Sequence, residues 1–390
     1  MKILIIVHNQ TNTNPFYKVF EMSMAISDKG NEVTILCTSP KKRFFSKSST
    51  KSKLEIFESP DLLWGHLRQG IDIWNIFHRL LFVMKNDFDV VHAIDCRPVV
   101  IFPALFLKIF KKTKLVLSWW DLFGSGATAL ERSGKFYVKT LGKVEIFFEE
   151  KFRKYADYSI VVTSLLKKKL MSLGLAEQSI KVLRVGAKKN QFNYYHKESA
   201  RKILNLPEKS MIFCYAGAIF QRDMELLLKA LSILKLKCVS NYLTIVIGRH
   251  KIQPDICSAL NIKLIERLPE LKDVYLYFNA SDYGLLPFNV SISNQARWPS
   301  KISDYIAASL PIITTPVSDL TEIFSRYNPG ILSMSDSPDD YSKALMQSFS
   351  TSEEEYQSKI INCRELMKNE LDWQLIAGET SKIYESVVNK

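Results

Sequence analysis

Short apolar runs alternate with longer amphipathic stretches along the first half of the chain. Each run is rich in branched apolar residues and is followed by a polar loop and a stretch of helical period. Such runs predict buried strands, and their alternation with helices predicts βαβ units with a parallel sheet. The clearest predicted helix is 15–29, which ends at Gly30. The predicted strands of this half are 3–8, 33–37, 90–93, 115–118 and 159–162.

A second cycle of the same pattern begins near residue 200 and predicts a second doubly wound domain. Its clearest helices are 224–234 and 300–308, and the segment 373–388 has the pattern of one amphipathic helix. Its predicted strands are 212–216, 244–247, 262–265, 283–286 and 312–314. The join is expected within the polar stretch 185–198. The predicted domains are an N-terminal domain of residues 1–190, a C-terminal domain of 191–372 and a final segment of 373–390.

The excess of positive over negative charge is confined to the first half of the chain. The formal charge of +13 divides into +14 over residues 1–190 and −1 over residues 191–390. Residues 41–53, KKRFFSKSSTKSK, are predicted to form a basic, serine-rich loop after the second strand. This distribution favours an anionic partner for the N-terminal half, and a generally basic surface is the alternative.

Several classes of protein are disfavoured. No apolar run reaches the roughly 18 residues of a membrane span. The absence of a P-loop and of GxGxxG argues against NTP hydrolysis and dinucleotide redox chemistry. The six cysteines form no CxxC pair, which is typical of free thiols in a cytoplasmic protein. The six histidines lack the spacing of metal ligands, so no metal cofactor is expected.

The strongest chemical signal is RWPSKISDYIAASLPIITT, residues 297–315. Pro299 suits the start of a helix, whose free N–H groups favour anions. Ser300 and Lys301 add a hydroxyl and a cation at that end, and Asp304 lies one turn further. A diphosphate at the helix end, with a ribose near Asp304, would use all three side chains. The alternative is a surface helix with a solvated Lys301.

A second signal is CYAGAIFQRDMELLLKAL, residues 214–231. The predicted strand ends at Gly217, and Arg222 opens the next helix at the carboxyl edge of the sheet. A guanidinium there can bind phosphate oxygens in bidentate fashion. The alternative is a surface ion pair of Arg222 with Asp223 or Glu225.

In their order and spacing, these segments resemble those of retaining GT-B glycosyltransferases, in particular family 4. The second half carries the resemblance through YAGAIFQRD, IVIGRH, DYGLLPF, PSKISDYIAASLPIITT and LDWQLIAGETSKIYESV. The first half matches more loosely, through MKILIIVH, DVVHAID, VLSWWDL and ADYSIVVTS. The resemblance implies two Rossmann-like domains facing a cleft, with the last helix crossing back onto the first domain. It implies transfer of a sugar, with retention, from a nucleotide-diphosphate donor.

The resemblance also implies residue roles. Arg222 and Lys301 would hold the diphosphate and stabilise its departure, Asp304 would meet the ribose, and the backbone of Glu270 and Leu271 would meet the base. The loop 288–294 would cover the donor sugar. The full set expected to bind the donor is Gly217, Arg222, Arg249, Glu270, Leu271, Asn294, Arg297, Ser300, Lys301 and Asp304.

In the first half, candidate residues follow predicted strands at the edge where open α/β sheets bind ligands. Asn12, Asp95, Trp120 and Asp121 are expected to bind the acceptor. His92 is expected to act in catalysis, since imidazole titrates near neutral pH; a hydrogen-bonded structural histidine is the alternative. The acceptor class is a growing surface polysaccharide or a lipid-linked saccharide.

Four departures from the family pattern keep two other functions open. Ala296 replaces the first glutamate of the Glu-x7-Glu motif, and Ala218 replaces an arginine that binds diphosphate. Residues 9–14 replace an early glycine pair, and Trp120 replaces the histidine of a His-Asp pair. A non-catalytic protein that binds nucleotide sugars, or an epimerase of the same fold, would also fit.

An apolar stripe also recurs at helical spacing, at Leu67, Ile71, Trp74, Phe77, Leu81 and Met84. Such a stripe more often packs in a core than against a membrane. Basic residues precede it, and a basic, aromatic segment also suits an anionic bilayer. The free thiols lead us to expect a cytoplasmic protein. The basic, aromatic segment makes the inner face of the cell membrane a candidate location.

Overall fold

The chain forms two compact units. In a computed structural model of the protein, the described residues are 1–41, 44–62, 70–124, 127, 141–188, 195–237, 239, 241–266, 268 and 270–390. Unit 1 comprises Met1–Gly186, Ala296–Trp298 and Asp372–Lys390, and unit 2 comprises Ala187–Gln295 and Pro299–Leu371. The first division thus falls at Gly186, four residues before the predicted boundary at residue 190.

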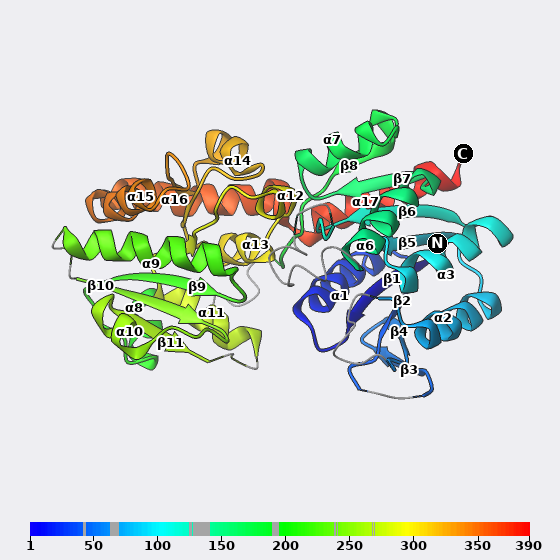
Figure 1. The fold of residues 1–390 in the computed structure, drawn as a ribbon, viewed down its shortest axis with the longest axis horizontal. Helices are drawn as coiled ribbons and strands as arrows, with labels where there is room; N and C mark the ends of the chain where they lie inside the picture. The colour runs from blue at the N-terminus through cyan, green and yellow to red at the C-terminus, as the bar shows by residue number, and fades with distance from the viewer. Residues whose placement is uncertain are drawn as a thin grey trace. The chain divides into compact units, whose positions relative to one another are not determined.

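Unit 1 is built on an eight-stranded sheet in the order β3-β4-β2-β1-β5-β6-β7-β8 (Figure 1). All described neighbours pair in parallel except β3 and β4. Its strands are β1 (Lys2–Gln10), β2 (Glu32–Thr38), β3 (Lys47–Lys51), β4 (Leu54–Ser59), β5 (Val90–Ile94), β6 (Lys114–Trp119), β7 (Tyr158–Val161) and β8 (Ile180–Val182). Its helices are α1 (Asn14–Ser27), α2 (Ile73–Lys85), α3 (Pro98–Phe110), α6 (Leu141–Lys151), α7 (Ser164–Ser172) and α17 (Trp373–Val388), with short 3₁₀ turns at Arg153–Tyr155 and Glu177–Ser179.

The core of unit 1 follows from the continuous apolar runs of the central strands. Residues 3–7 of β1 and 90–94 of β5 are buried throughout, as expected for parallel strands covered on both faces. Helices α2 and α3 pack together, and α1 packs with α17. The central strands and α1 and α17 lie where the sequence predicted them.

The edge of the sheet differs from the prediction. Residues 47–51, expected to belong to a loop, form strand β3, which pairs antiparallel with β4. Ser52 makes the hairpin turn at φ +57°, and every side chain of β3 is exposed. The strand has no apolar face, so its polar sequence carried no strand signal.

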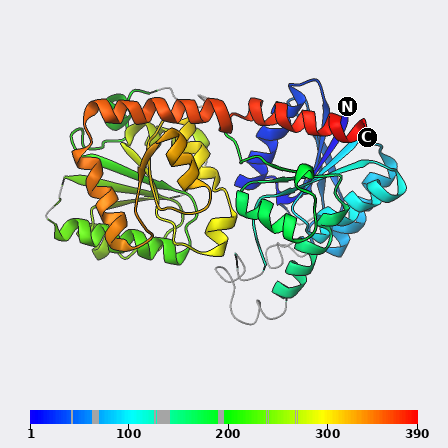
Figure 2. The same ribbon diagram turned by 90° about the horizontal axis from the view of Figure 1, so that it is seen from above.

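Helix α17 is joined to α1 by side-chain hydrogen bonds. Trp373 Nε1 donates to Glu21 Oε2 at 3.1 Å, and Gln374 Nε2 donates to Asp28 Oδ2 at 2.9 Å. In Figure 2 the red helix α17 runs along the dark blue α1. The buried face of α17 includes Trp373, Ile376 and Tyr384, so this helix completes the core of unit 1.

Unit 2 contains a six-stranded, wholly parallel sheet in the order β11-β10-β9-β12-β13-β14 (Figure 1). Its strands are β9 (Met211–Ala216), β10 (Tyr242–Ile247), β11 (Ile262–Ile265), β12 (Tyr283–Leu286), β13 (Ile312–Thr314) and β14 (Gly330–Leu332). Its helices are α8 (Lys197–Ile203), α9 (Gln221–Leu236), α10 (Pro254–Ala259), α11 (Leu271–Ala280), α12 (Ile292–Ala296), α13 (Ser300–Ala307), α14 (Leu320–Tyr327), α15 (Pro338–Ser350) and α16 (Glu353–Leu366), with a π-helical turn at Met367–Leu371. Both units are Rossmann-like, as predicted.

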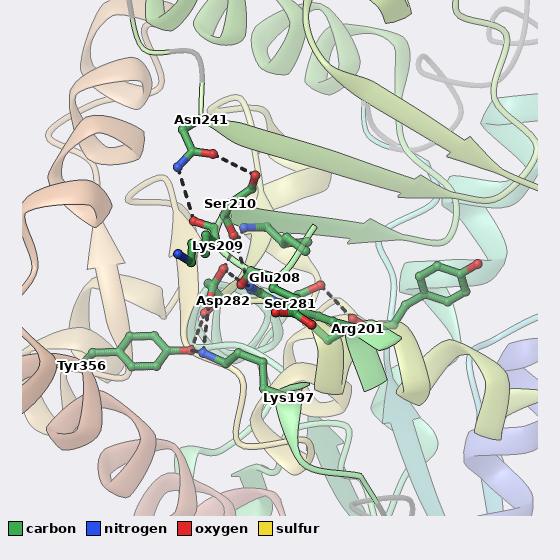
Figure 3. A network of polar contacts seen from close by, with 12 residues as sticks. Lys197, Arg201, Glu208, Lys209, Ser210, Asn241, Ser281, Asp282 and Tyr356 are labelled. Atoms are coloured by element: carbon green, nitrogen blue, oxygen red, sulfur yellow. Dashed lines mark hydrogen bonds and ion pairs between the residues drawn. The ribbon is translucent and has the colours of Figure 1, made fainter. Parts of the chain in front are cut away.

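At the amino ends of β9 and β12, one carboxylate ties several elements together (Figure 3). Asp282 accepts from Lys197 Nζ at 2.8 Å, from Arg201 at 2.6 Å and from the Ile212 amide at 2.7 Å. Tyr356, on α16, donates to the Asp282 carbonyl at 3.0 Å. At this edge of the sheet, two cations are therefore paired with one carboxylate.

Candidate functional site

The strand order of unit 2 reverses between β9 and β12, and ligands of open α/β sheets bind beyond the carboxyl ends at such a point. The chain leaves β9 through Gly217 at φ +93°, a conformation that a side chain disfavours. The Gly217 amide donates to Ile247 O at 2.9 Å, which fixes the turn. A Cβ atom at Gly217 would meet Lys301 Cε at 3.9 Å. The structure thus brings Gly217 and Lys301 together.

Lys301 lies in the first turn of α13, and its ammonium reaches the loop after β9. Nζ donates to Ala218 O at 2.8 Å and to the Tyr215 hydroxyl, and it lies 4.1 Å from the centre of the Tyr215 ring. The amino end of a helix and a cation therefore meet at one point. This arrangement suits a phosphate group.

His250 belongs to the same site, and the sequence analysis did not single it out. It follows β10, and its ring lies edge-on to Tyr215 with centroids 6.1 Å apart. Burial lowers the pKa of His250, and the charge of Lys301 lowers it further. A neutral imidazole thus stands beside the cation. Its position after a strand end, in IVIGRH, was the available signal.

Asn294, predicted to bind the donor, lies in α12 and holds the segment that precedes this helix. Its side chain is buried, and Nδ2 donates to Asp223 Oδ1 at 3.0 Å and to Asn289 O at 3.0 Å. Asp223 is wholly buried in the first turn of α9 and also accepts from the Asn289 amide at 2.9 Å. Asp223 therefore fixes the loop after β12, a role that the sequence analysis missed.

Asp304, predicted to meet the donor ribose, is largely buried in the second turn of α13. It is 8% exposed, and the Tyr275 hydroxyl donates to Oδ1 at 3.4 Å. A ribose would reach this carboxylate only at its exposed margin.

The remaining predicted residues of unit 2 lie near strand ends or helix starts. Ser300 begins α13 and is half-buried, and Arg222 is exposed in the first turn of α9. Arg249 is exposed directly after Gly248. Glu270 precedes α11, is exposed and pairs with Lys272 at 2.8 Å, and Leu271 is half-buried.

Arg297, by contrast, belongs to unit 1, as do Ala296 and Trp298. The buried Ala296 accepts from Thr163 Oγ1 at 3.1 Å through its carbonyl oxygen.

Three of the predicted acceptor residues come together in unit 1. Asp95 follows β5 with φ +62°, and its Oδ1 accepts from the Trp120 amide at 3.1 Å. Burial raises the pKa of Asp95 to about 7, and the charge of Asp121 contributes to the rise. A strained, buried carboxyl that titrates near neutrality is typical of functional sites. Asn12 lies exposed in the turn after β1.

Glu149 of α6 supports the loop that follows β6, and the sequence analysis did not identify it. Its carboxylate accepts from the Phe123 and Gly124 amides, both at 2.9 Å, and from Trp119 Nε1 at 3.0 Å. Residues 125–126 lie outside the described residues. Glu149 thus positions the segment that carries Trp120 and Asp121.

The catalytic role predicted for His92 needs correction. His92 is 1% exposed, with Nδ1 2.6 Å from the Tyr384 hydroxyl and Nε2 2.6 Å from Ser118 Oγ. Burial lowers its pKa to about 3, so the ring stays neutral. Because both nitrogens are bonded inside the core, His92 joins β5 to α17 and has the structural role that was the alternative.

Among the described residues, no group of three or more His, Cys, Asp or Glu side chains could hold a metal ion. In that part of the chain, no helix combines the length and apolar character needed to span a membrane.

Solved structures share this architecture over nearly the whole chain. Sucrose-phosphate synthase from Thermosynechococcus elongatus matches with a TM-score of 0.73 and 12% identity, over 100% of this chain and 99% of that one. WaaG, a glycosyltransferase involved in lipopolysaccharide biosynthesis, matches with a TM-score of 0.72 and 14% identity, over 98% and 99%. HepE from Anabaena in complex with UDP-glucose matches with a TM-score of 0.66 and 12% identity, over 99% and 100%. The chain has the GT-B fold.

Matches to two family models assign the chain to a narrower class within this fold. Residues 19–188 match the model described as Glycosyltransferase Family 4, and residues 196–365 match the one described as glycosyl transferases group 1. The protein is a GT-B glycosyltransferase of the family 4 type. A curated relative is chitobiosyldiphosphodolichol beta-mannosyltransferase of Debaryomyces hansenii, 21% identical over 302 residues. The match covers 71% of this chain and 63% of the relative, so it spans less than two thirds of the relative's length.

Proposed function

We propose that this glycosyltransferase moves a hexose-type group from a nucleotide-diphosphate sugar to a glycan or lipid-linked saccharide, with retention, in the synthesis of a surface polysaccharide. The observation that carries the proposal is the position of Lys301. Its ammonium contacts the Gly217–Ala218 turn at the start of α13, where the strand order reverses. A departing diphosphate needs stabilisation of this kind, since negative charge develops on it in the transition state.

Arg222 would share the diphosphate with Lys301, and His250 would contribute a neutral ring beside it. Cations and helix N–H groups can compensate diphosphate charge, so we propose that transfer needs no bound metal. Chelation by EDTA should then leave the rate unchanged. Complexes of HepE with UDP-glucose and of an Escherichia coli protein with UDP-2-fluoro glucose support a nucleotide-sugar donor.

The acceptor is proposed to bind unit 1 near Asp95, Trp120 and Asp121, whose polar groups suit sugar hydroxyls. The relative's name describes a sugar transfer to a lipid-linked saccharide, which supports an acceptor of that class. An enzyme that uses such acceptors would work in the cytoplasm at the inner face of the cell membrane.

The test is a panel of nucleotide sugars, each incubated with the protein with and without lipid-linked or soluble glycan acceptors. We expect one donor to release its nucleotide in an acceptor-dependent manner. Binding with no release under any condition would indicate a non-catalytic protein that binds nucleotide sugars. Isomerisation of the donor without acceptor would indicate an epimerase.

The stereochemical part has its own test. An NMR spectrum of the first product should show the anomeric configuration of the donor. The relative is named as a beta-mannosyltransferase, so a product of the inverted configuration alone would replace retention by inversion and leave the donor site unaffected.

A further inference from the structure

A tyrosine of α13 holds this helix against the carboxyl end of β9. Ile212 O accepts from the Asp282 amide at 2.8 Å, on the side of β9 where β12 lies. Alternate residues of a strand face the same neighbour, so Cys214 and Ala216 also face β12. The Tyr305 hydroxyl accepts from the Ala216 amide at 3.0 Å and donates to Cys214 O at 3.2 Å. Helix α13 is therefore bonded to β9 at the point where the strand order reverses.

The close approach of this tyrosine needs a glycine in the sheet. Gly284 of β12 pairs with Cys214, and a Cβ atom at Gly284 would lie 2.6 Å from Tyr305 Cδ2. The tyrosine ring thus occupies the space of a side chain at this strand position. Tyr305 is wholly buried, and burial raises the pKa of its hydroxyl, which therefore stays protonated and able to donate. These contacts fix the place of α13 at the ligand edge.

Lys301 and Tyr305 are four residues apart on α13, so they share the helix face that meets β9. The Lys301 ammonium donates to the Tyr215 hydroxyl, and that hydroxyl donates to Ala218 O at 2.7 Å. Ala218 O also accepts from Lys301 Nζ at 2.8 Å, so the bonds form a closed ring of three groups. The Tyr215 side chain is wholly buried, and the centre of its ring lies 4.1 Å from the ammonium. Both the hydroxyl and the ring of one residue therefore hold the cation.

An ammonium that is ordered before a ligand arrives favours binding. A lysine side chain loses rotamer freedom when it is held, and ordering that precedes binding does not reduce the affinity. An ammonium has three N–H donors, so Lys301 can exchange its bond to Ala218 O for one to a phosphate oxygen and keep its bond to Tyr215. Its position matters in this chain because residue 218 is an alanine, so that position supplies no further cation.

We propose that Tyr215 is a positioning residue of the phosphate site, whose hydroxyl directs the Lys301 ammonium toward the phosphates of a nucleoside diphosphate. This proposal rests on the proposed function, since it takes the start of α13 as the diphosphate site. It gives a buried tyrosine of β9 a part in ligand affinity as well as in the core. Because the hydroxyl acts through Lys301, its effect on nucleotide binding should disappear when the ammonium is removed.

The experiment is a double-mutant cycle of Tyr215→Phe and Lys301→Ala. Calorimetry measures the affinities for UDP, GDP, ADP, CDP and dTDP. Tyr215→Phe keeps the ring and removes the hydroxyl, so the fold should persist. We expect it to weaken binding of the nucleotide that the wild type prefers by about three- to tenfold, the range of a typical hydrogen bond. In the Lys301→Ala background, the same change should leave the affinity unaltered.

The matched control is Tyr356→Phe. It removes a hydroxyl that donates to the Asp282 carbonyl at 3.0 Å, at the opposite edge of the same sheet. Chemical denaturation should show losses of stability of similar size for Tyr356→Phe and Tyr215→Phe. The control should nevertheless bind nucleotide as the wild type does.

Three results would overturn the proposal, and they are distinguishable. If Tyr215→Phe binds nucleotide as well as the wild type or better, while Lys301→Ala binds it more weakly, the hydroxyl does not position the ammonium and the proposed donor site stands. If Tyr215→Phe weakens binding equally in both backgrounds, the hydroxyl acts on the fold and not through Lys301. If Lys301→Ala binds as the wild type does, or the wild type binds none of the nucleotides, the proposed donor site and the role of Tyr215 fail together.

Discussion

The cations at the two edges of the unit 2 sheet have different hydrogen-bond partners. At the amino edge, Asp282 is surrounded by Lys197, Arg201 and the Ile212 amide, all within 2.8 Å. At the carboxyl edge, Lys301 contacts a carbonyl oxygen and a hydroxyl, and burial together with this charge keeps His250 neutral. One edge pairs its cations with a carboxylate inside the protein. At the other edge, Lys301 lies against a carbonyl oxygen and a hydroxyl, which an anionic ligand could displace.

This difference separates stability from function within a single sheet. Removal of a carboxylate from a buried ion pair leaves an uncompensated charge, which strongly destabilises a fold. Removal of a cation held by a carbonyl and a hydroxyl leaves neutral groups, which disturbs the fold much less. Substitutions at the amino edge should therefore change the free energy of unfolding, and substitutions at the carboxyl edge should change the affinity for nucleotide.

The largest expected effect is at the amino edge. Asp282→Ala should lower the free energy of unfolding by about 3–5 kcal/mol, because Arg201 stays buried without its carboxylate. Chemical denaturation measures this directly. Asp255→Ala, at an exposed position on α10, is the control and should change little. A loss below about 1 kcal/mol at Asp282 would remove the contrast between the edges.

The next effect is at the carboxyl edge. Lys301→Ala should weaken binding of nucleoside diphosphates by roughly 1.5–3 kcal/mol, the range of a charge-assisted hydrogen bond, and Arg222→Ala should behave similarly. The free energy of unfolding should change much less than for Asp282→Ala. Calorimetric titration compares both with Lys235→Ala, an exposed lysine on α9. If both variants bind nucleotide as wild type does, the site lies elsewhere.

A third substitution extends the contrast to unit 1. Folding raises the pKa of Asp95 from 3.8 to about 7, so the folded state holds a proton that the unfolded state releases near pH 4. Stability of the wild type should therefore fall as pH rises through this window and level off above it. Asp95→Asn keeps the acceptor oxygen for the Trp120 amide, tolerates positive φ and does not titrate.

Thermal unfolding across pH measures the result. At pH 8, Asp95→Asn should be more stable than wild type by up to about 4 kcal/mol, since the pKa rises from 3.8 to about 7 and each pKa unit corresponds to about 1.4 kcal/mol. The two proteins should converge near pH 4. A constant difference at all pH values would show that Asp95 is not protonated in the folded state.

The smallest effect concerns the turn at the ligand edge. Gly217→Ala should destabilise the fold by about 1 kcal/mol, because alanine disfavours positive φ and the added methyl meets only Lys301. Gly174→Ala has nearly the same φ, +90°, with no atom within 4 Å of the added Cβ, and should cause the same loss of stability. Only the change at Gly217 should also weaken nucleotide binding. Equal affinity in both variants would place the ligand away from this turn.

The sequence predicted the elements whose side chains are uniformly buried. Strands β12 and β13 begin and end at the predicted residues because their buried runs between turns allow one interpretation. The sequence analysis placed Gly217 and Lys301 in the same predicted donor site. This was possible because Gly217 follows the end of a predicted strand and Lys301 lies at the start of a predicted helix. The match to the family models confirms the class that their order indicated.

The features that the sequence did not predict depend on contacts between residues far apart in the chain, or on which face of a helix points toward the sheet. The partner of His92 is Tyr384, 292 residues away, so its structural role has no local signal. Asp223 was considered only as a surface partner of Arg222, although its real partners are Asn289 and Asn294. Periodicity located the stripe on α2, but a stripe alone does not say which face points inward. The buried hydrogen bonds of Arg79 decide that.

The position of α17 in unit 1 has a consequence for biosynthesis. Translation proceeds from the amino end, so the ribosome makes every residue of unit 2 before it makes α17. Until α17 emerges, Glu21 lacks Trp373 and His92 lacks Tyr384. The first sheet to be synthesised is therefore the second to be completed, because it still lacks the buried face of α17.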